Sequence, residues 1–166
     1  GIDNVSVIAL NSFIDPKLIY HGIHDNEKNP VLVIENKVDY GRFVGNQKIE
    51  FFNIKRSLDV YPIVKCSPVS GSPSLTLVTY GGISVDAMNQ LHEIFKLTDL
   101  IPELIVLSKI SPLDISPVLD SVKITKRIVT VEEGSKGFGI GAEIISQVNE
   151  ALGSSVILSK RIGAKP

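Results

Sequence analysis

Hydrophobic residues gather into short runs near the start of the chain, and their spacing predicts a small structural unit. Residues 5–10 form a mostly apolar, β-branched run that predicts a buried strand. Asp15 before Pro16 predicts a helix start, because aspartate caps helices and proline suits their first turn. A second apolar run at 31–34 follows a polar turn. Such a strand–helix–strand unit favours parallel strands joined by a right-handed crossover.

The periodic pattern is lost between residues 42 and 72, where glycine, proline, asparagine and charged residues are frequent. We expect a connecting segment here, with one or two short strands, the favoured position being 58–64. Residues 66–73, Cys-Ser-Pro-Val-Ser-Gly-Ser-Pro, are the stretch most typical of a linker.

Strands and helices alternate regularly after Pro73. Apolar runs predict strands at 75–79, 104–107, 127–131 and 155–158. Helical spacing of apolar residues predicts helices at 84–96, at 114–122, and from Phe138 or Ile140 to Leu152. This alternation is typical of an α/β fold with an open, mostly parallel sheet and helices on both faces.

Composition and charge narrow the class of protein. The 166 residues carry a formal net charge of −1 and no tryptophan, so no nucleic-acid partner is indicated. No apolar run approaches the ~20 residues that span a bilayer, so no membrane partner is expected either. The single cysteine, Cys66, fits a reducing compartment, and we expect a cytoplasmic protein with an unreactive thiol. The absent initiator methionine and the abrupt end predict a fragment of a longer chain.

The glycine-rich stretch at 134–141 precedes a predicted helix and leaves three interpretations open. Glycine-rich turns before helices cradle phosphates in many proteins, but Glu132 and Glu133 would repel an anion here. No Gly-Lys-Ser/Thr pattern occurs either. The alternatives are close packing of helix on sheet and a surface that docks another subunit or domain.

The turn at 78–82, Val-Thr-Tyr-Gly-Gly, has a similar ambiguity between a nucleotide site and a structural turn. The next predicted strand ends in Leu107-Ser108-Lys109, without the acidic residue that would hold a ribose. A structural strand-to-helix turn is therefore the favoured interpretation.

The three histidines do not complete a metal or catalytic set. His21 and His24 are three residues apart on one predicted helix, but no further cysteine or close carboxylate pair accompanies them. His92 lies near the apolar stripe of its helix, which favours packing or an interface. No Ser-His-Asp arrangement and no G-x-S-x-G elbow is evident.

Four motifs occur in an order and at distances that resemble one known family. They are Val78-Thr-Tyr-Gly81, Ile110-Ser-Pro-Leu-Asp114, Arg127-Ile-Val-Thr-Val-Glu-Glu-Gly134 and Gly139-Ile-Gly-Ala-Glu143. They resemble the C-terminal domain of the transketolase superfamily, and most closely the beta subunit of thiamine-diphosphate-dependent 2-oxo acid dehydrogenases. The chain departs from the family at 107–109, where Leu-Ser-Lys replaces the usual Asp-Leu-Arg, and in its glycine spacing at 136–141.

The resemblance implies three parts of the chain. Residues 1–42 would be the end of an upstream pyrimidine-binding domain, 43–73 a linker and 74–166 the C-terminal domain. Thiamine diphosphate and Mg²⁺ would be bound upstream in the parent enzyme, which oxidatively decarboxylates a 2-oxo acid and transfers the acyl group to lipoyl. On this hypothesis the fragment holds no catalytic or cofactor-binding residue and is inactive alone.

The implied role is assembly, as a homo-oligomer or with an alpha subunit or domain, and docking of a dihydrolipoyl acyltransferase core. Candidate interface residues are Gly137, Gly139, Gly141 and Glu143 at the glycine-rich helix start, and Met88 and His92 on the 84–96 helix. Some family members bind potassium at a helix-to-strand turn. The residues of that turn here are His24, Glu27 and Asn29, and we expect an incomplete site.

Two alternatives stay open. The chain could be a fragment of a transketolase or deoxyxylulose phosphate synthase, with Arg42, Arg56 or Arg161 near a substrate phosphate. It could also be a free-standing α/β module that binds a nucleotide or a partner.

Overall fold

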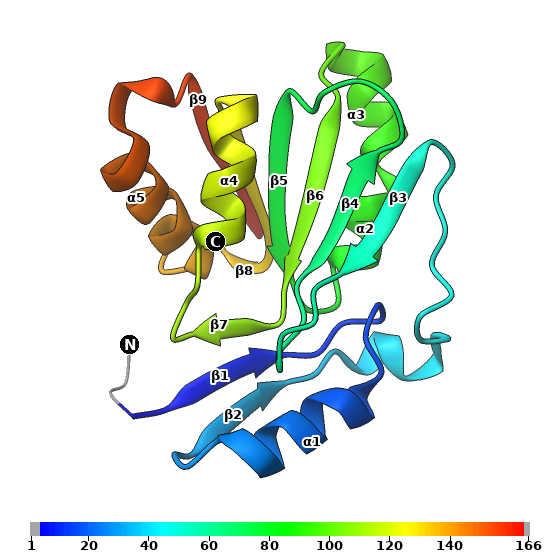
Figure 1. Cartoon of the computed structure of the whole chain (residues 1–166), viewed down its shortest axis with the longest axis vertical. Helices are drawn as coiled ribbons and strands as arrows, with labels where there is room; N and C mark the ends of the chain where they lie inside the picture. The colour runs from blue at the N-terminus through cyan, green and yellow to red at the C-terminus, as the bar shows by residue number, and fades with distance from the viewer. Residues whose placement is uncertain (1–3, 165–166) are drawn as a thin grey trace.

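The computed structural model describes residues 4–164, which form two sheets of unequal size (Figure 1). The larger sheet has six strands in the order β3-β4-β6-β5-β8-β9. Their bounds are β3 Phe52–Arg56, β4 Val64–Pro68, β5 Leu75–Tyr80, β6 Pro102–Leu107, β8 Arg127–Ser135 and β9 Leu158–Ala164. Strands β6, β5, β8 and β9 run parallel, whereas β3 and β4 add an antiparallel edge. The predicted α/β fold with a mostly parallel sheet is confirmed.

Helices cover both faces of this sheet. The helices are α2 Ser84–Asn89, α3 Leu91–Thr98, α4 Ser116–Thr125 and α5 Ile140–Leu152. On one face, α2 and α3 bury Met88 and Leu91 against Leu77. On the other, α4 and α5 bury Val122 and Ile144 against β5 and β8. Alternate residues of a strand point to opposite faces of the sheet, so each central strand contributes side chains to both cores. This explains why its sequence is a continuous apolar run.

The upstream residues form the predicted parallel strand–helix–strand unit. Its elements are β1 Ser6–Ala9, α1 Pro16–Asn26 and β2 Val31–Ile34, followed by a short 3₁₀ helix, η1, at Lys37–Gly41. The Asp15 carboxylate accepts a hydrogen bond from the Lys17 amide at 2.9 Å, which confirms the predicted helix start. A short strand from the other part of the chain, β7 Lys109–Ser111, pairs antiparallel with β1. Ile8 and Phe13 share a core with the large sheet, so the unit is packed onto it.

The connecting segment does hold two short strands, β3 and β4, but the position expected for a strand, 58–64, is wrong. The chain turns back there, closed by hydrogen bonds from the Ser57 amide to the Ile63 carbonyl and from the Ile63 amide to the Ser57 hydroxyl, both 2.9 Å. Leu58 is fully exposed at the tip of this turn. The turn joins β3 to β4, and β4 pairs with β6, so part of the segment 43–73 is hydrogen-bonded into the large sheet.

Three further boundaries differ from expectation. The helix expected at 84–96 is interrupted at Gln90, where the amide bonds back to the Ala87 carbonyl in a tighter, 3₁₀-type contact. The helix expected from Asp114 begins at Ser116, whose amide donates to the Asp114 carboxylate at 2.9 Å. The last strand begins at Leu158 instead of Ser155, because a 3₁₀ turn, η2 Gly153–Ser155, takes up the preceding residues.

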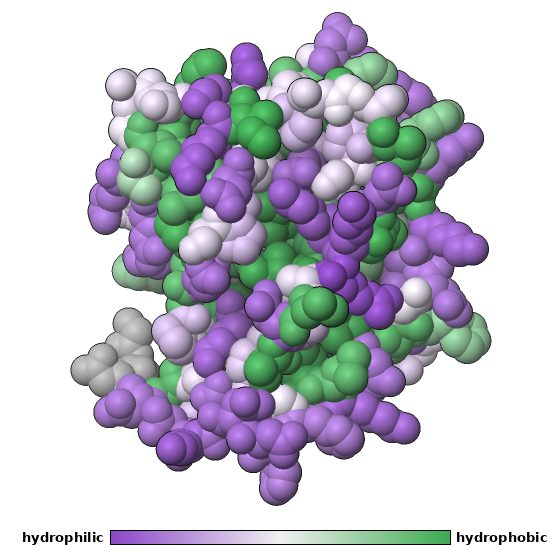
Figure 2. All heavy atoms as spheres, viewed as in Figure 1, coloured by the Kyte–Doolittle hydropathy of each residue, from purple (hydrophilic) through white to green (hydrophobic). Residues whose placement is uncertain are grey.

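Among residues 4–164, no helix is long and apolar enough to cross a bilayer. Figure 2 shows hydrophobic side chains at the surface over the junction between the large sheet and the β1–α1–β2 unit. Large exposed apolar side chains in this part of the chain include Leu32, Tyr40 and Phe43.

Candidate functional site

The glycine-rich stretch connects β8 to α5 and packs on a buried carboxylate. Glu132, which is only 3% exposed, lies beneath the first turn of α5. A Cβ atom on Gly139 would collide with this carboxylate. A Cβ atom on Gly141 would collide with Thr130 and lie 2.8 Å from Glu132 Oε1. These glycines allow a close approach that any side chain would block, in agreement with the packing interpretation.

The Glu132 carboxylate occupies the position that an anion would need at the start of α5. The Gly141 amide points at Glu132 Oε2 from 3.5 Å, and the Tyr80 hydroxyl donates to the same oxygen at 3.2 Å. Burial, and next the charge of Glu132, raise the pKa of Tyr80 to about 12, so the phenol keeps its proton. Because a carboxylate already faces the positive end of the helix, a diphosphate does not fit there.

The turn after β5 is closed by the upstream unit. Gly81 adopts a positive φ of 70°, and a Cβ atom on Gly82 would collide with the Asn36 side chain. Asn36 Nδ2 also donates to Glu133 Oε1 at 2.8 Å. A nucleotide phosphate placed at this turn would have to displace Asn36, which favours the structural interpretation.

The turn at 24–29, where the family resemblance suggests a potassium ion, is dominated by an ion pair. Glu27 accepts from Lys109 at 2.7 Å, from Ser6 at 2.7 Å and from Tyr61 at 2.9 Å. The bond from Lys109, followed by that from Ser6, lowers the pKa of Glu27 to about 2. Through its ion pair with Lys109, the Glu27 carboxylate therefore connects the upstream unit to β7.

The other two residues suggested for potassium, His24 and Asn29, are exposed. No group of three His, Cys, Asp or Glu side chains suited to a metal ion occurs among residues 4–164. A potassium site built on backbone carbonyls here stays a prediction.

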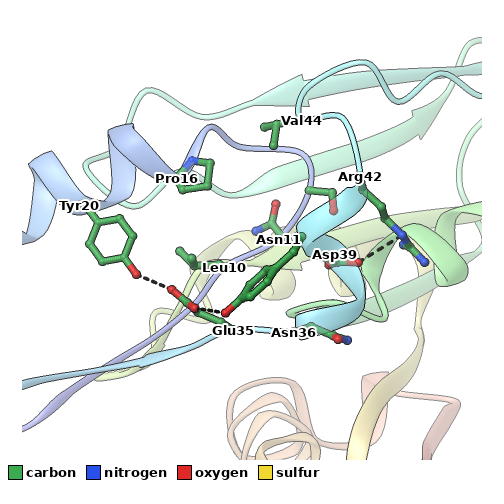
Figure 3. A pocket seen from close by; sticks show the side chains of 11 residues that line it. Leu10, Asn11, Pro16, Tyr20, Glu35, Asn36, Asp39, Arg42 and Val44 are labelled. Carbon is green, nitrogen blue, oxygen red and sulfur yellow. Dashed lines mark hydrogen bonds and ion pairs between the residues drawn. The ribbon is translucent and has the colours of Figure 1, made fainter.

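A crevice of about 290 Å³ opens where β1 and β2 end, between α1 and η1 (Figure 3). Glu35 lies between two tyrosines and accepts from Tyr20 at 2.5 Å and from Tyr40 at 2.7 Å. These bonds, that of Tyr20 first, lower the pKa of Glu35, and they raise the pKa of both phenols. The tyrosine protons are held on oxygen, so neither phenol is poised as a base.

The arginines suggested for a substrate phosphate are engaged with groups of the chain itself. Arg42 pairs with Asp39 at 3.2 Å and with Asp86 at 3.6 Å. Arg56 donates to the Gly45 carbonyl at 3.4 Å, and Arg161 to the Lys136 carbonyl at 2.9 Å. The structure does not bring the three guanidinium groups together through any shared partner.

The six candidate interface residues fall into different environments. Gly137 and Glu143 are exposed, whereas Gly139 is half-buried and Gly141 is buried. Met88, only 2% exposed, points into the core, so its position on a helix misled the expectation of a surface residue. His92 is half-buried, contacts the Glu50 carbonyl at 2.8 Å and stacks edge-on near Phe51.

Sequence reasoning missed Phe138, the most exposed aromatic side chain described in the structure. It has a positive φ of 61°, a conformation that is rare outside glycine, asparagine and aspartate. The signal was present, because an aromatic residue inside a run of glycines is unusual. Cys66 was expected to be an unreactive thiol in a loop, but it lies buried on β4. Burial, with the nearby charge of Glu103, raises the pKa of its thiol to about 12.

Comparison with known proteins identifies what the chain is similar to. A model of the transketolase C-terminal domain matches residues 65–162. The beta subunit of the pyruvate dehydrogenase E1 component from Rickettsia bellii is 34% identical over 151 residues, covering 89% of this chain. The mitochondrial subunit of the same name from Chaetomium thermophilum is 31% identical over 155 residues, covering 90% of this chain.

The chain spans 42% of the Rickettsia protein and 38% of the Chaetomium protein. Among solved structures, one titled "Split gene transketolase, inactive beta4 tetramer" superimposes with a TM-score of 0.64 at 16% identity. That match covers 98% of this chain and 49% of the other. Since the family model covers more than half of the chain and the beta subunits match most of it, the chain belongs to the transketolase C-terminal domain family.

Proposed function

We propose that this chain is the C-terminal assembly domain of the decarboxylating component of a thiamine-diphosphate-dependent 2-oxo acid dehydrogenase. The observation that carries the proposal is the 34% identity to a pyruvate dehydrogenase beta subunit over 89% of the chain, together with coverage of only 42% of that subunit. The chemistry of the parent enzyme, oxidative decarboxylation and acyl transfer to lipoyl, would then be completed by residues outside this chain.

The geometry supports a role without catalysis or cofactor binding. Thiamine diphosphate needs a cradle for its diphosphate, and the residues present do not fit it. The two glycine turns of the described chain are filled from within, one by Glu132 and the other by Asn36. The cofactor and its Mg²⁺ would therefore be held by the parent enzyme elsewhere.

Assembly is the role that remains for the surface of such a domain. The partners we propose are a second copy, an alpha subunit or domain of the parent, and the dihydrolipoyl acyltransferase core, in the cytoplasm. Two features support an interface on the glycine-rich helix start: the exposure of Glu143 and the exposed, strained Phe138 beside it.

A fragment of a transketolase or deoxyxylulose phosphate synthase is the second candidate, favoured by the superposition on a transketolase. At 16% identity, that likeness concerns the fold. The engagement of Arg42, Arg56 and Arg161 with groups of this chain also counts against a phosphate-binding role for them.

The test is thiamine-diphosphate-dependent ferricyanide reduction with a panel of 2-oxo acids. One sample is this chain and the other is the longer parent with any partner subunit. We expect activity only in the parent. Activity in this chain alone would refute the assembly role, and a parent active only on sugar phosphates would establish the second candidate.

A further inference from the structure

The crevice between α1 and η1 lies where ligands bind in many α/β folds. Its volume is about 290 Å³, and it is lined by Leu10 and Glu35, which directly follow the parallel strands β1 and β2. Ligands of open α/β sheets bind outside the carboxyl ends of parallel strands. The assembly role proposed above does not use this crevice.

The hydrogen bonds inside the crevice leave acceptors facing a ligand. Tyr20 and Tyr40 both donate their hydroxyl protons to Glu35, so neither O–H group is free for a ligand. Each carboxylate oxygen takes one of these bonds and keeps a further lone pair, as does each phenol oxygen. The part of the crevice around Glu35 therefore offers acceptors rather than donors.

The crevice also carries one negative charge that no cation of the described chain offsets. Glu35 forms no ion pair with a lysine, arginine or histidine of residues 4–164. The other carboxylate that lines the crevice, Asp39, lies 3.2 Å from the Arg42 guanidinium, so these two charges offset each other. The bonds from Tyr20 and Tyr40 hold the pKa of Glu35 below its usual range, which keeps it ionised at neutral pH.

This charge and these acceptors exclude two classes of ligand. An anion would be repelled by Glu35 and would find no free donor beside it. A metal ion needs several oxygen or nitrogen ligands, and no group of three His, Cys, Asp or Glu side chains suited to one occurs among residues 4–164. A single exposed carboxylate between two phenols does not complete such a set.

An organic cation matches the remaining features. The rings of Tyr20 and Tyr40 stand on either side of Glu35 (Figure 3), and aromatic rings attract a cation through their negative faces. The hydrocarbon part of such a ligand would contact the apolar side chains that line the crevice, which are Leu10, Pro16 and Val44. Ligand pockets commonly measure ~300–1,000 Å³, so a crevice of this size suits a small compound.

We propose that this crevice binds a small alkylammonium compound, with Glu35 as its counter-ion and the rings of Tyr20 and Tyr40 against the cation. The proposal goes beyond the assembly role and does not depend on the enzyme class of the parent. Binding to the crevice and activity of the parent are measured separately, so either proposal can fail without the other.

Amide NMR spectra of the full chain during titration with butylammonium chloride test the proposal. We expect saturable shifts at the amides around Glu35 and Tyr40. Butanol and butyrate, compared at equal ionic strength, have a similar size but are neutral and anionic. We expect neither to bind, because neither compensates the charge of Glu35. An absence of saturable shifts with butylammonium, or equal binding of butanol, would overturn the proposal.

Three variants test the roles of the side chains. Glu35→Gln should weaken butylammonium binding at least ~10-fold, because it removes the counter-ion. Tyr40→Leu removes one ring and should weaken binding ~3-fold. Glu150→Gln is the matched control, because Glu150 is exposed on α5, outside the crevice, and should leave the affinity unchanged. Circular dichroism verifies folding, and equal affinities of Glu35→Gln and the control would overturn the proposal.

A lysine side chain of another protein carries the same ammonium group as a small amine. Lysine blocked as its acetyl methylamide presents that side chain between two peptide groups and separates the two sources. We expect it to bind more weakly than butylammonium, because fixing the attached peptide groups costs conformational entropy. Tighter binding of the blocked lysine would overturn the assignment to a small amine.

Discussion

Two buried glutamates on the large sheet are held in opposite ways. Glu103, at the start of β6, is 4% exposed and accepts hydrogen bonds from Ser67 at 2.7 Å and from Ser121 at 2.6 Å, with the Lys65 ammonium at 3.1 Å. Glu132, near the end of β8, is equally buried but has only the longer contacts from Tyr80 and the Gly141 amide. Its Oε1 atom has no hydrogen-bond partner within residues 4–164.

This difference shows which kind of interaction stabilises the regions around Glu103 and Glu132. Around Glu103 the hydroxyls continue as a chain, because Thr76 contacts Ser121 at 2.8 Å and Thr125 at 2.7 Å. That region is held by polar bonds that join β4, β5, β6 and α4. Around Glu132 the fit of glycine against carboxylate is steric, and the hydroxyl of Thr130 also lacks a partner among the described residues. Satisfied networks rigidify a core, whereas unsatisfied ones are costly.

The largest loss of stability is expected where glycines pack against the Glu132 carboxylate. Gly141→Ala would drive a methyl group into Thr130 and the Glu132 carboxylate, and we expect it to lower the free energy of unfolding by about 3 kcal/mol. Urea denaturation measures this change. The matched control is Gly134→Ala, where a Cβ atom meets nothing within 4 Å and should change stability by less than about 0.5 kcal/mol.

Two amide substitutions compare the carboxylates directly. Glu103→Gln removes the negative charge that two hydroxyl groups and the Lys65 ammonium stabilise. It also places the amide NH₂ group against one of these hydrogen-bond donors. We therefore expect the free energy of unfolding to fall by about 2 kcal/mol. Glu132→Gln should cost less than about 1 kcal/mol, because its present bonds are long. Equal losses in urea denaturation, or a larger loss for Glu132→Gln, would show that the comparison is wrong.

The main features of the fold could be predicted from the sequence because they follow from periodicity. The apolar runs that became β5, β6 and β8 and the helix 140–152 are local patterns. The β3–β4 edge was not predicted, because the residues that pair with β4 lie about forty positions later on β6. Met88 was misplaced because an apolar residue on a helical stripe can face the core of its own chain or a partner, and the pattern does not distinguish the two.

The candidate site was predictable only in part, for a similar reason. The glycines at 139 and 141 indicated that the helix packs closely on the sheet. The acidic pair, Glu132 and Glu133, indicated from the sequence alone that an anion would not bind there. That Glu132 itself faces the helix start depends on packing across β8 and α5. The bonds from Ser67 and Ser121 to Glu103 join residues 36 and 18 positions apart, which no local pattern reveals.

The rate at which Cys66 is labelled tests the same comparison of the Glu103 and Glu132 regions, with a smaller expected effect. It lies on β4, opposite Leu104 and one residue after Lys65, and its thiol is buried with a pKa raised to about 12. We expect very slow labelling by a thiol reagent at pH 8, because the thiolate is scarce and enclosed. Glu103→Gln should accelerate labelling more than Glu132→Gln, since it loosens the strands around the thiol and also removes a negative charge that raises the pKa of the thiol. Similar rates in both variants would show that opening at β4 does not depend on the Glu103 network.

A third carboxylate extends the comparison to the junction between the two sheets, with the smallest expected effect. Glu27 is bonded to Lys109, Ser6 and Tyr61, and its pKa is lowered from 4.5 to about 2. A depressed pKa in the folded state means that the stabilisation is fully present above pH 4.5 and is lost as the pH falls toward 2. Glu27→Gln should therefore flatten the dependence of unfolding free energy on pH within that window, whereas Glu50→Gln, at an exposed position, should preserve it. If the free energy of unfolding depends on pH in the same way in the wild-type chain and in Glu27→Gln, the ion pair between Glu27 and Lys109 does not contribute to stability, although it connects the upstream unit to β7.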